Sequence, residues 1–174
     1  MDATVQAALE SFGRSCRMAG IPWQLGGSGL LFSLGLVDAV RDLDVVFPAD
    51  VMDQLAEVVE ESTGSAPSFS ARQEDGFVSG FRGQHHWDGV ELDMTAGIAL
   101  DYGTLTVRLP FEPGGLWMVG DEEIPLAPLD QWLLIYRFHN PERAALLDGA
   151  VGEPGWADLV ARLGLPDGFS GYRA

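Results

Sequence analysis

The segment 42–47 (DLDVVF) places the strongest constraint on the fold of this chain. Four of the five residues from 43 to 47 are apolar, which is typical of a strand in the centre of a sheet. Asp42 and Asp44 stand at the start of that strand. Because side chains alternate along a strand, both carboxylates project from one face, with their Cα atoms about 7 Å apart.

Amphipathic patterns on both sides of this strand predict an α+β domain with a mixed sheet. The expected helices are 2–19, 30–36, a helix that opens at Asp50 as N-cap and ends at Gly64, and three late helices (from Pro128 to near 138, from 140 to near 149, and 154–163). The expected strands are 23–25, 43–47, 77–81, 84–87 and 90–98, with a hairpin turn at Asp88-Gly89. The segments 105–107 and 117–119 are either short strands or parts of a long loop rich in Gly and Pro. A composition shift near Gly120 divides the prediction into a core, 1–120, and a helical C-terminal subdomain, 121–174.

Charge and cysteine content exclude several classes of partner. The 174 residues include 26 acidic and 10 basic side chains and no lysine, giving a formal net charge of −16. A cationic surface for nucleic acid or an anionic membrane is not expected, whereas cationic small molecules and divalent metals are favoured. Cys16 is the single cysteine, so no intramolecular disulfide is possible. Without a cationic leader or an apolar run near the ~20 residues of a membrane span, a cytoplasmic location is expected.

A glycine-rich turn joins the strand at 23–25 to the following helix. Gly26, Gly27 and Gly29 would let backbone N–H groups approach an anion, and the Ser28 hydroxyl can donate to a phosphate oxygen. The alternative is that these glycines serve only the tight geometry of a strand–helix turn.

The paired carboxylates suggest a cation site. Asp42 and Asp44 on one face of an apolar strand would repel each other unless a cation relieves them, and Mg²⁺ prefers carboxylate and phosphate oxygens. The alternative is a solvated sheet edge, with Asp42 ending the preceding turn and Asp44 facing water.

A second acidic strand strengthens the case for a site. In the segment VELDM, period two puts Glu91 and Asp93 on one face and the apolar residues on the other. If this strand lies beside Asp42 and Asp44, three or four carboxylates converge, as two-metal phosphoryl chemistry requires. Asp93 is the stronger candidate, and Glu91 is expected to be an exposed strand residue.

The order of these motifs resembles the signature of the polymerase-β-like nucleotidyltransferase superfamily. The matching residues are Gly27-Ser28, a spacer of thirteen residues, Asp42-Leu43-Asp44-Val45, and Asp93 on a later strand. The match covers roughly 21–98 and is similar to small bacterial members, which include antibiotic nucleotidyltransferases and toxins of toxin–antitoxin systems. It implies a nucleotidyltransferase-like mixed sheet flanked by helices.

The resemblance also implies a function and a set of residues. A nucleoside triphosphate such as ATP would bind at the glycine turn, and Asp42 and Asp44 would hold Mg²⁺. Arg41 would either reach a phosphate or pair with a nearby acid. Asp93 would be a third metal ligand or the base that accepts the proton. The reaction would transfer a nucleoside monophosphate to a hydroxyl of a small cationic molecule or a protein.

The chain departs from the family in its cations. Many members hold the triphosphate with Lys or Arg, and here Arg137 and Arg143 on the late helices are the replacements, unless they are surface charges. Two alternatives stay open. One is a catalytically degenerate module that binds or regulates, and the other is a hydrolase with Asp42 or Asp44 opposite Asp93 across a cleft. The sequence leaves the oligomeric state undetermined.

Overall fold

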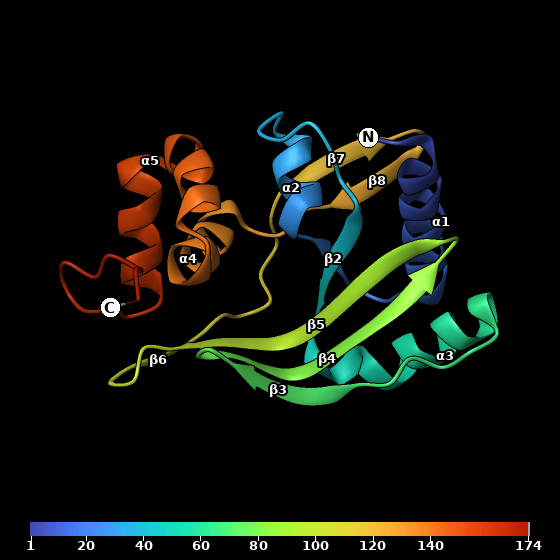
Figure 1. Cartoon of the computed structure of the whole chain (residues 1–174), viewed down its shortest axis with the longest axis horizontal. Helices are drawn as coiled ribbons and strands as arrows, with labels where there is room; N and C mark the ends of the chain where they lie inside the picture. The colour runs from blue at the N-terminus through green and yellow to red at the C-terminus, as the bar shows by residue number, and fades with distance from the viewer. Residues whose placement is uncertain (174) are drawn as a thin grey trace.

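The computed structural model describes residues 1–173 and has an α+β architecture with a mixed sheet, as predicted, beside a separate two-stranded antiparallel sheet. Figure 1 shows the elements in order. The helices are α1 (Ala3–Ala19), α2 (Gly27–Ser33), the short 3₁₀ turn η1 (Ala49–Val51), α3 (Met52–Thr63), α4 (Leu129–His139) and α5 (Pro141–Arg162). The strands are β1 (Gln24–Leu25), β2 (Asp42–Phe47), β3 (Ser70–Glu74), β4 (Phe77–Trp87), β5 (Val90–Asp101), β6 (Thr106–Arg108), β7 (Leu116–Val119) and β8 (Glu122–Pro125).

The main sheet places β2 in its interior, next to β5. Its order is β1-β2-β5-β4-β3, with β6 paired to the far end of β5. The β2–β5 pair is parallel and the other pairs are antiparallel. The β4–β5 hairpin turns at Asp88-Gly89, where both residues have positive φ, as a two-residue hairpin requires.

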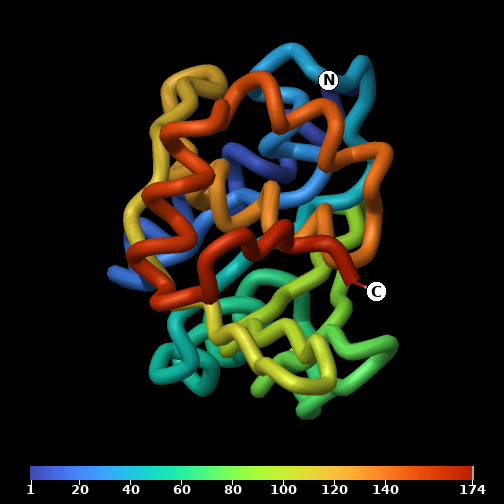
Figure 2. Tube along the Cα trace, turned by 90° about the vertical axis from the view of Figure 1, so that its left-hand side faces the viewer, coloured from blue at the N-terminus to red at the C-terminus, as the bar shows by residue number. Residues whose placement is uncertain are grey.

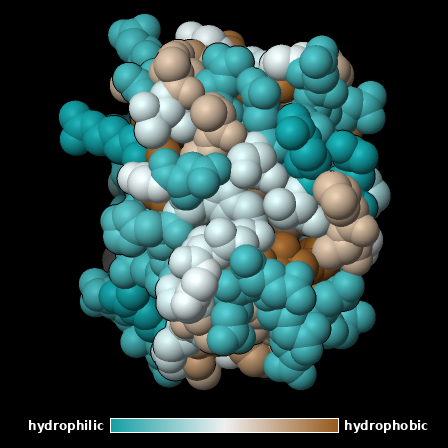
Figure 3. Space-filling model, turned by 90° about the vertical axis from the view of Figure 1, so that its right-hand side faces the viewer, coloured by the Kyte–Doolittle hydropathy of each residue, from teal (hydrophilic) through white to brown (hydrophobic). Residues whose placement is uncertain are grey.

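One face of β2 and β5 packs against α1 in an aromatic core. Phe12 of α1 is fully buried and makes edge-to-face contacts with Trp23, Phe47 and Trp87, at centroid distances of 5.1, 6.3 and 5.2 Å. The strand residues that point to this side are buried to 1% exposure or less: Leu43, Val45, Phe47, Leu92 and Met94. The outer surface on the α1 and α3 side of the molecule is mostly hydrophilic, with one small hydrophobic hollow (Figure 3).

The helices α4 and α5 lie at the opposite end of the molecule, and the C-terminal segment crosses between them and the sheet hairpins (Figures 1 and 2). Arg137 holds this segment, since it donates to the Ser170 carbonyl at 2.9 Å, pairs with Asp148 at 2.6 Å and stacks on Trp156. This arginine therefore has a structural role in the C-terminal part.

Several boundaries differ from the predictions. The helix expected at 30–36 begins at Gly27, and the strands expected at 77–81 and 84–87 form the single strand β4. Asp50 is not an N-cap: it lies inside η1, and α3 begins after Val51 without a side-chain cap. The helices expected at 140–149 and 154–163 meet as α5 at a kink at Gly152, whose φ of 66° interrupts the helix. The exposed edge strand β3 was not predicted, because none of its residues is buried.

Candidate functional site

The parallel pairing of β2 and β5 brings the two acidic motifs together. Asp42 lies opposite Glu91, and Asp44 lies opposite Asp93. All four project from the face that the aromatic core does not cover, because their strand neighbours are buried on the other side. Glu91 is exposed and accepts a hydrogen bond from Gln84 at 3.0 Å, so Asp42, Asp44 and Asp93 are the more enclosed acids of this face.

The glycine turn lies directly against Asp44. The backbone N–H of Gly26 donates to the Asp44 carbonyl at 2.8 Å. Gly27 has a φ of +52°, and a Cβ built there would lie 1.6 Å from Oδ2 of Asp44. No side chain fits between the turn and this carboxylate, so glycine at 27 is what lets the two meet.

The other residues of the turn have more ordinary surroundings. A Cβ at Gly26 would meet the Trp132 ring at 1.9 Å, and one at Gly29 would meet Leu25 at 2.8 Å, so tight packing explains these two glycines. The buried Ser28 hydroxyl donates to Oδ1 of Asp42 at 3.4 Å. Arg41 is exposed just before β2 and does not line the cavity described below.

Asp44 carries a perturbed carboxyl. Burial, together with the neighbouring carboxylates of Asp42 and Asp93, raises its pKa to about 7, whereas the Ser28 backbone N–H and the charge of Arg143 act in the opposite direction. A carboxyl that is desolvated among like charges is stabilised in its ionised form by a cation, so this position favours a positively charged ligand.

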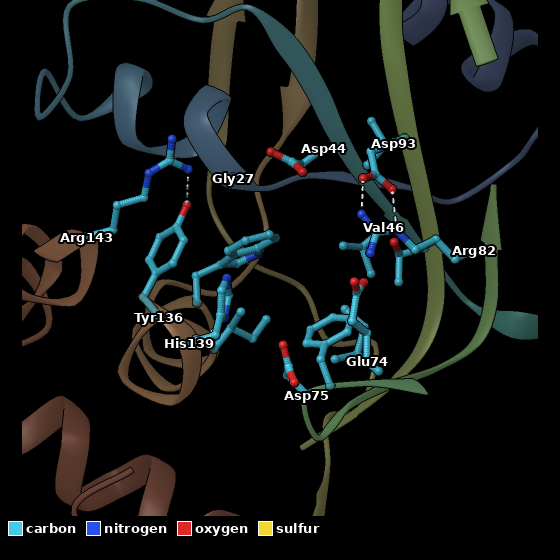
Figure 4. Close-up of a pocket in the computed structure, with 16 residues that line it drawn as sticks. Gly27, Asp44, Val46, Glu74, Asp75, Arg82, Asp93, Tyr136, His139 and Arg143 are labelled. Atoms are coloured by element: carbon cyan, nitrogen blue, oxygen red, sulfur yellow. Dashed lines mark hydrogen bonds and ion pairs between the residues drawn. The ribbon is translucent and has the colours of Figure 1, made fainter. Parts of the chain in front are cut away.

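Asp93 is already paired with a cation. Arg82 of β4 donates from Nε to Oδ1 at 3.0 Å and from a terminal nitrogen to Oδ2 at 2.5 Å. In Figure 4 the Asp93 carboxylate points toward Arg82, whereas that of Asp44 points toward the Gly27 turn. The sequence alone does not identify Arg82, because its contact with Asp93 depends on how β4 and β5 pair. Arg82 lies opposite Thr95, two residues beyond Asp93 on the same face, which is within diagonal reach of a long side chain.

Asp44 and Asp93 line one wall of a cavity of about 440 Å³, and Asp42 lies on the same face of β2 outside its lining. The opposite wall comes from α4 and α5, and Tyr136, His139 and Arg143 face the acids across the cavity (Figure 4). Arg143 donates to the Tyr136 hydroxyl at 3.3 Å, and burial raises the pKa of Tyr136 to about 12, so the hydroxyl stays protonated. A guanidinium and a hydroxyl thus stand across from the glycine turn, an arrangement suited to phosphate oxygens.

The far end of the cavity is formed by the β3–β4 hairpin and is again acidic. Glu74, Asp75 and Phe77 line it together with His139 of α4. Burial lowers the pKa of His139, whose Nδ1 bonds the Ile135 carbonyl at 2.7 Å, so its ring is neutral at physiological pH. The place of His139 and Tyr136 on the cavity wall depends on how α4 packs against the sheet, so no pattern in the sequence marks them as site residues.

The donor set fits a divalent ion only in part. Within residues 1–173, no three His, Cys, Asp or Glu side chains are arranged so as to hold one metal ion. Asp42 and Asp44 share a face and form no ion pair with any arginine or histidine in the described part of the chain, whereas both oxygens of Asp93 are taken by Arg82. Two carboxylates suit Mg²⁺, which is usually bound by one or two carboxylates plus water and substrate phosphates.

No protein family model matches the sequence, and no curated protein has a significant sequence match to it. Likewise, no helix within residues 1–173 has the length and apolar character needed to cross a membrane.

Solved structures, in contrast, match most of the chain. ANT(2″)-Ia in complex with adenylyl-2″-tobramycin superimposes with a TM-score of 0.64 at 14% identity, over 92% of this chain and 97% of that one. A candidate nucleotidyltransferase from Thermotoga maritima gives a TM-score of 0.63 at 14% identity, over 88% and 92%. The lincosamide antibiotic adenylyltransferase LnuA, lincomycin-bound, gives 0.52 at 15% identity, over 82% and 95%. The chain therefore has the nucleotidyltransferase fold that the sequence predicted.

Proposed function

We propose that this protein is a metal-dependent nucleotidyltransferase that moves a nucleoside monophosphate from a nucleoside triphosphate, such as ATP, to a hydroxyl of a small acceptor. The observation that carries the proposal is the contact of the Gly27 turn with Asp44, on a face shared with Asp42 and Asp93. The similarity of the fold to structures of antibiotic adenylyltransferases supports it.

Each wall of the cavity has a part in the proposed reaction. The triphosphate would lie between the Gly27 turn and Arg143, whose guanidinium offsets its charge. Mg²⁺ at Asp42 and Asp44 would supply charge neutralisation at the phosphate being transferred. The acceptor hydroxyl would enter from the β3–β4 end, where Asp75 favours a cationic molecule and the Glu74 carboxylate is already paired with Arg72.

In the proposed step, the acceptor oxygen forms a bond to the α-phosphorus and the bond between that phosphorus and the bridging oxygen to the β-phosphate breaks. Pyrophosphate leaves with the electron pair of that bond. The hydroxyl proton passes to a base. Asp44 already has a raised pKa before any ion binds, but a bound cation would lower it, so the proposal leaves the proton to solvent or product phosphate.

The experiment is pyrophosphate release from ATP and the other nucleoside triphosphates, with Mg²⁺ and a panel of hydroxyl compounds. Aminoglycoside-like polycations, neutral polyols and protein serine or tyrosine residues form its three arms. Release that depends on a cationic acceptor and disappears in Asp42→Ala/Asp44→Ala supports the proposal. Release that is equal with and without an acceptor would instead indicate a hydrolase.

A second candidate is a non-catalytic module of the same fold that binds a nucleotide. It is favoured by the pairing of Asp93 with Arg82, which withdraws one of three acids from the site. Such a module would bind a nucleoside triphosphate with Mg²⁺ and release no pyrophosphate with any acceptor. The hydrolase hypothesis requires acids facing each other across a cleft, whereas Asp44 and Asp93 lie on adjacent strands.

A further inference from the structure

Arg82 and Asp93 form a closed pair inside the cavity wall. Both carboxylate oxygens of Asp93 accept from the same guanidinium, at 3.0 and 2.5 Å. The side chains are 25% and 13% exposed, respectively, so the pair is largely shielded from water. Two parallel charge-assisted hydrogen bonds make this the strongest type of Arg–carboxylate contact.

Strand pairing fixes the pair in place. Asp93 lies opposite Gln84 on β4, and Arg82 comes from the same strand two residues earlier, within the diagonal reach of a long side chain. Both backbones belong to the interior of the sheet, where β4 and β5 pair over nearly their whole length. The guanidinium cannot leave Asp93 without leaving a shielded carboxylate uncompensated beside Asp44, which is unfavourable.

The charges on this face favour one ion over two. Glu91 on this face is exposed, and the three enclosed acids, Asp42, Asp44 and Asp93, carry three negative charges when ionised, one of which Arg82 already neutralises. A single divalent cation at Asp42 and Asp44 brings these three acids and Arg82 to neutrality. A second ion would leave excess positive charge and would have to displace the guanidinium to reach Asp93.

We propose that Arg82 is a positioning residue that keeps Asp93 out of the ion site, so that the apoprotein binds one divalent cation through Asp42 and Asp44 alone. The proposal rests on the proposed function, because it assumes a cation at Asp42 and Asp44. Under this proposal Asp93 does not coordinate metal, in contrast to the expectation for all three acids. The Arg82 guanidinium neutralises Asp93 in place of a second ion.

The test is equilibrium binding of Mn²⁺ to the protein without nucleotide at physiological ionic strength. The electron paramagnetic resonance signal of the free ion measures how much Mn²⁺ is bound. The informative variant is Arg82→Gln/Asp93→Asn, which removes one positive and one negative charge together. We expect it to bind one Mn²⁺ with an affinity within about threefold of the wild type. Arg82→Gln alone frees Asp93 to join the site, so its affinity should rise by about tenfold or more.

Controls separate this proposal from the one on which it rests. Arg14→Gln removes an arginine of α1 that pairs with Glu122 of β8, outside the cavity, and reports the effect of net charge alone. Asp44→Asn should abolish the site. If Asp44→Asn binds Mn²⁺ like the wild type, the metal site of the proposed function is wrong.

One pair of results would overturn the inference: Asp44→Asn loses the ion, and Arg82→Gln/Asp93→Asn binds Mn²⁺ roughly tenfold or more weakly than the wild type. A loss of that size is expected when a group that coordinates the ion is removed. Two bound ions per wild-type chain that both depend on Asp44 would overturn it as well. Should the double variant not fold, Arg82→Lys replaces it. Lysine cannot bind both carboxylate oxygens at once, so an Mn²⁺ affinity above that of the wild type supports the proposal, and an unchanged affinity contradicts it.

Discussion

The two faces of β2 and β5 differ in almost every physical property although they share one backbone. On one face, Leu43 and Leu92 are fully buried against the α1 side of the core, where Phe12 makes three aromatic contacts. On the other face, Asp44 and Asp93 stand opposite each other and line a cavity. The apolar face stabilises the two strands. This stabilisation lets the other face hold carboxylates whose desolvation and mutual repulsion lower the stability of the fold.

Replacing Asp44 should have the largest effect on activity. We expect Asp44→Asn to lower nucleotidyl transfer by roughly a thousandfold, because the variant loses a charge needed to hold the ion at the transferred phosphate. Thermal stability without ligand should stay equal or rise, since the asparagine removes a desolvated charge. Pyrophosphate release and thermal melting measure the two effects. A parallel loss of stability and activity would show that this face does not pay such a cost.

Replacing Phe12 should have the opposite signature. Its ring is fully buried, and Phe12→Ala should lower the free energy of unfolding by about 3–5 kcal/mol. The transfer rate per folded molecule should change little, because Phe12 does not line the cavity. Denaturant unfolding and activity measured well below the melting temperature separate these effects. A large change in rate for the folded variant would break the division between the two faces.

The Asp44 carboxyl also predicts a pH dependence of stability. Its folded pKa, about 7, lies above the ordinary aspartate value of 3.8, so the folded state holds this proton over a range in which the unfolded state has released it. The contribution of Asp44 to stability therefore falls as the pH rises from about 4 to about 7 and stays constant above. Asp44→Asn should remove this component from melting curves recorded across that range. An identical pH profile in the variant would contradict the raised pKa.

The two late arginines provide the smallest and most selective test. Arg143 lines the cavity, whereas Arg137 binds Asp148 and the C-terminal segment. Arg143→Ala should raise the KM for the nucleoside triphosphate by roughly tenfold with little change in stability. Arg137→Ala, the matched control, should cost about 1–2 kcal/mol of stability and leave KM unchanged. Equal effects of both variants on KM would argue against a phosphate site at Arg143.

Most of the fold can be predicted from local sequence patterns. The alternation in VELDM and in the apolar strand after Asp42 indicates which side chains share a face, and the structure shows that these two strands lie side by side, the condition on which a shared acidic site depends. The edge strand β3 cannot be predicted from hydrophobic alternation, because none of its residues is buried. The prediction of Asp50 as an N-cap was wrong, because Asp50 lies inside η1, before the start of α3.

The candidate site was less accessible from sequence, because it depends on packing between distant elements. Arg82 becomes meaningful only when β4 lies beside β5, and Tyr136 only when α4 faces the acids across the cavity. No periodicity within either segment reports those contacts. The sequence indicates the glycine turn. It does not indicate why position 27 must be glycine, because the reason is the close contact with Asp44, which lies on a different element.

The central claim is that the acidic face binds a nucleoside triphosphate together with a divalent cation. Isothermal titration of the protein with ATP, in the presence of Mg²⁺ and then of EDTA, tests it most directly. The account predicts binding that requires Mg²⁺ and is lost in Asp42→Ala/Asp44→Ala while that variant melts as a folded protein. Binding that is equally tight without Mg²⁺, or that survives in the double variant, would contradict it.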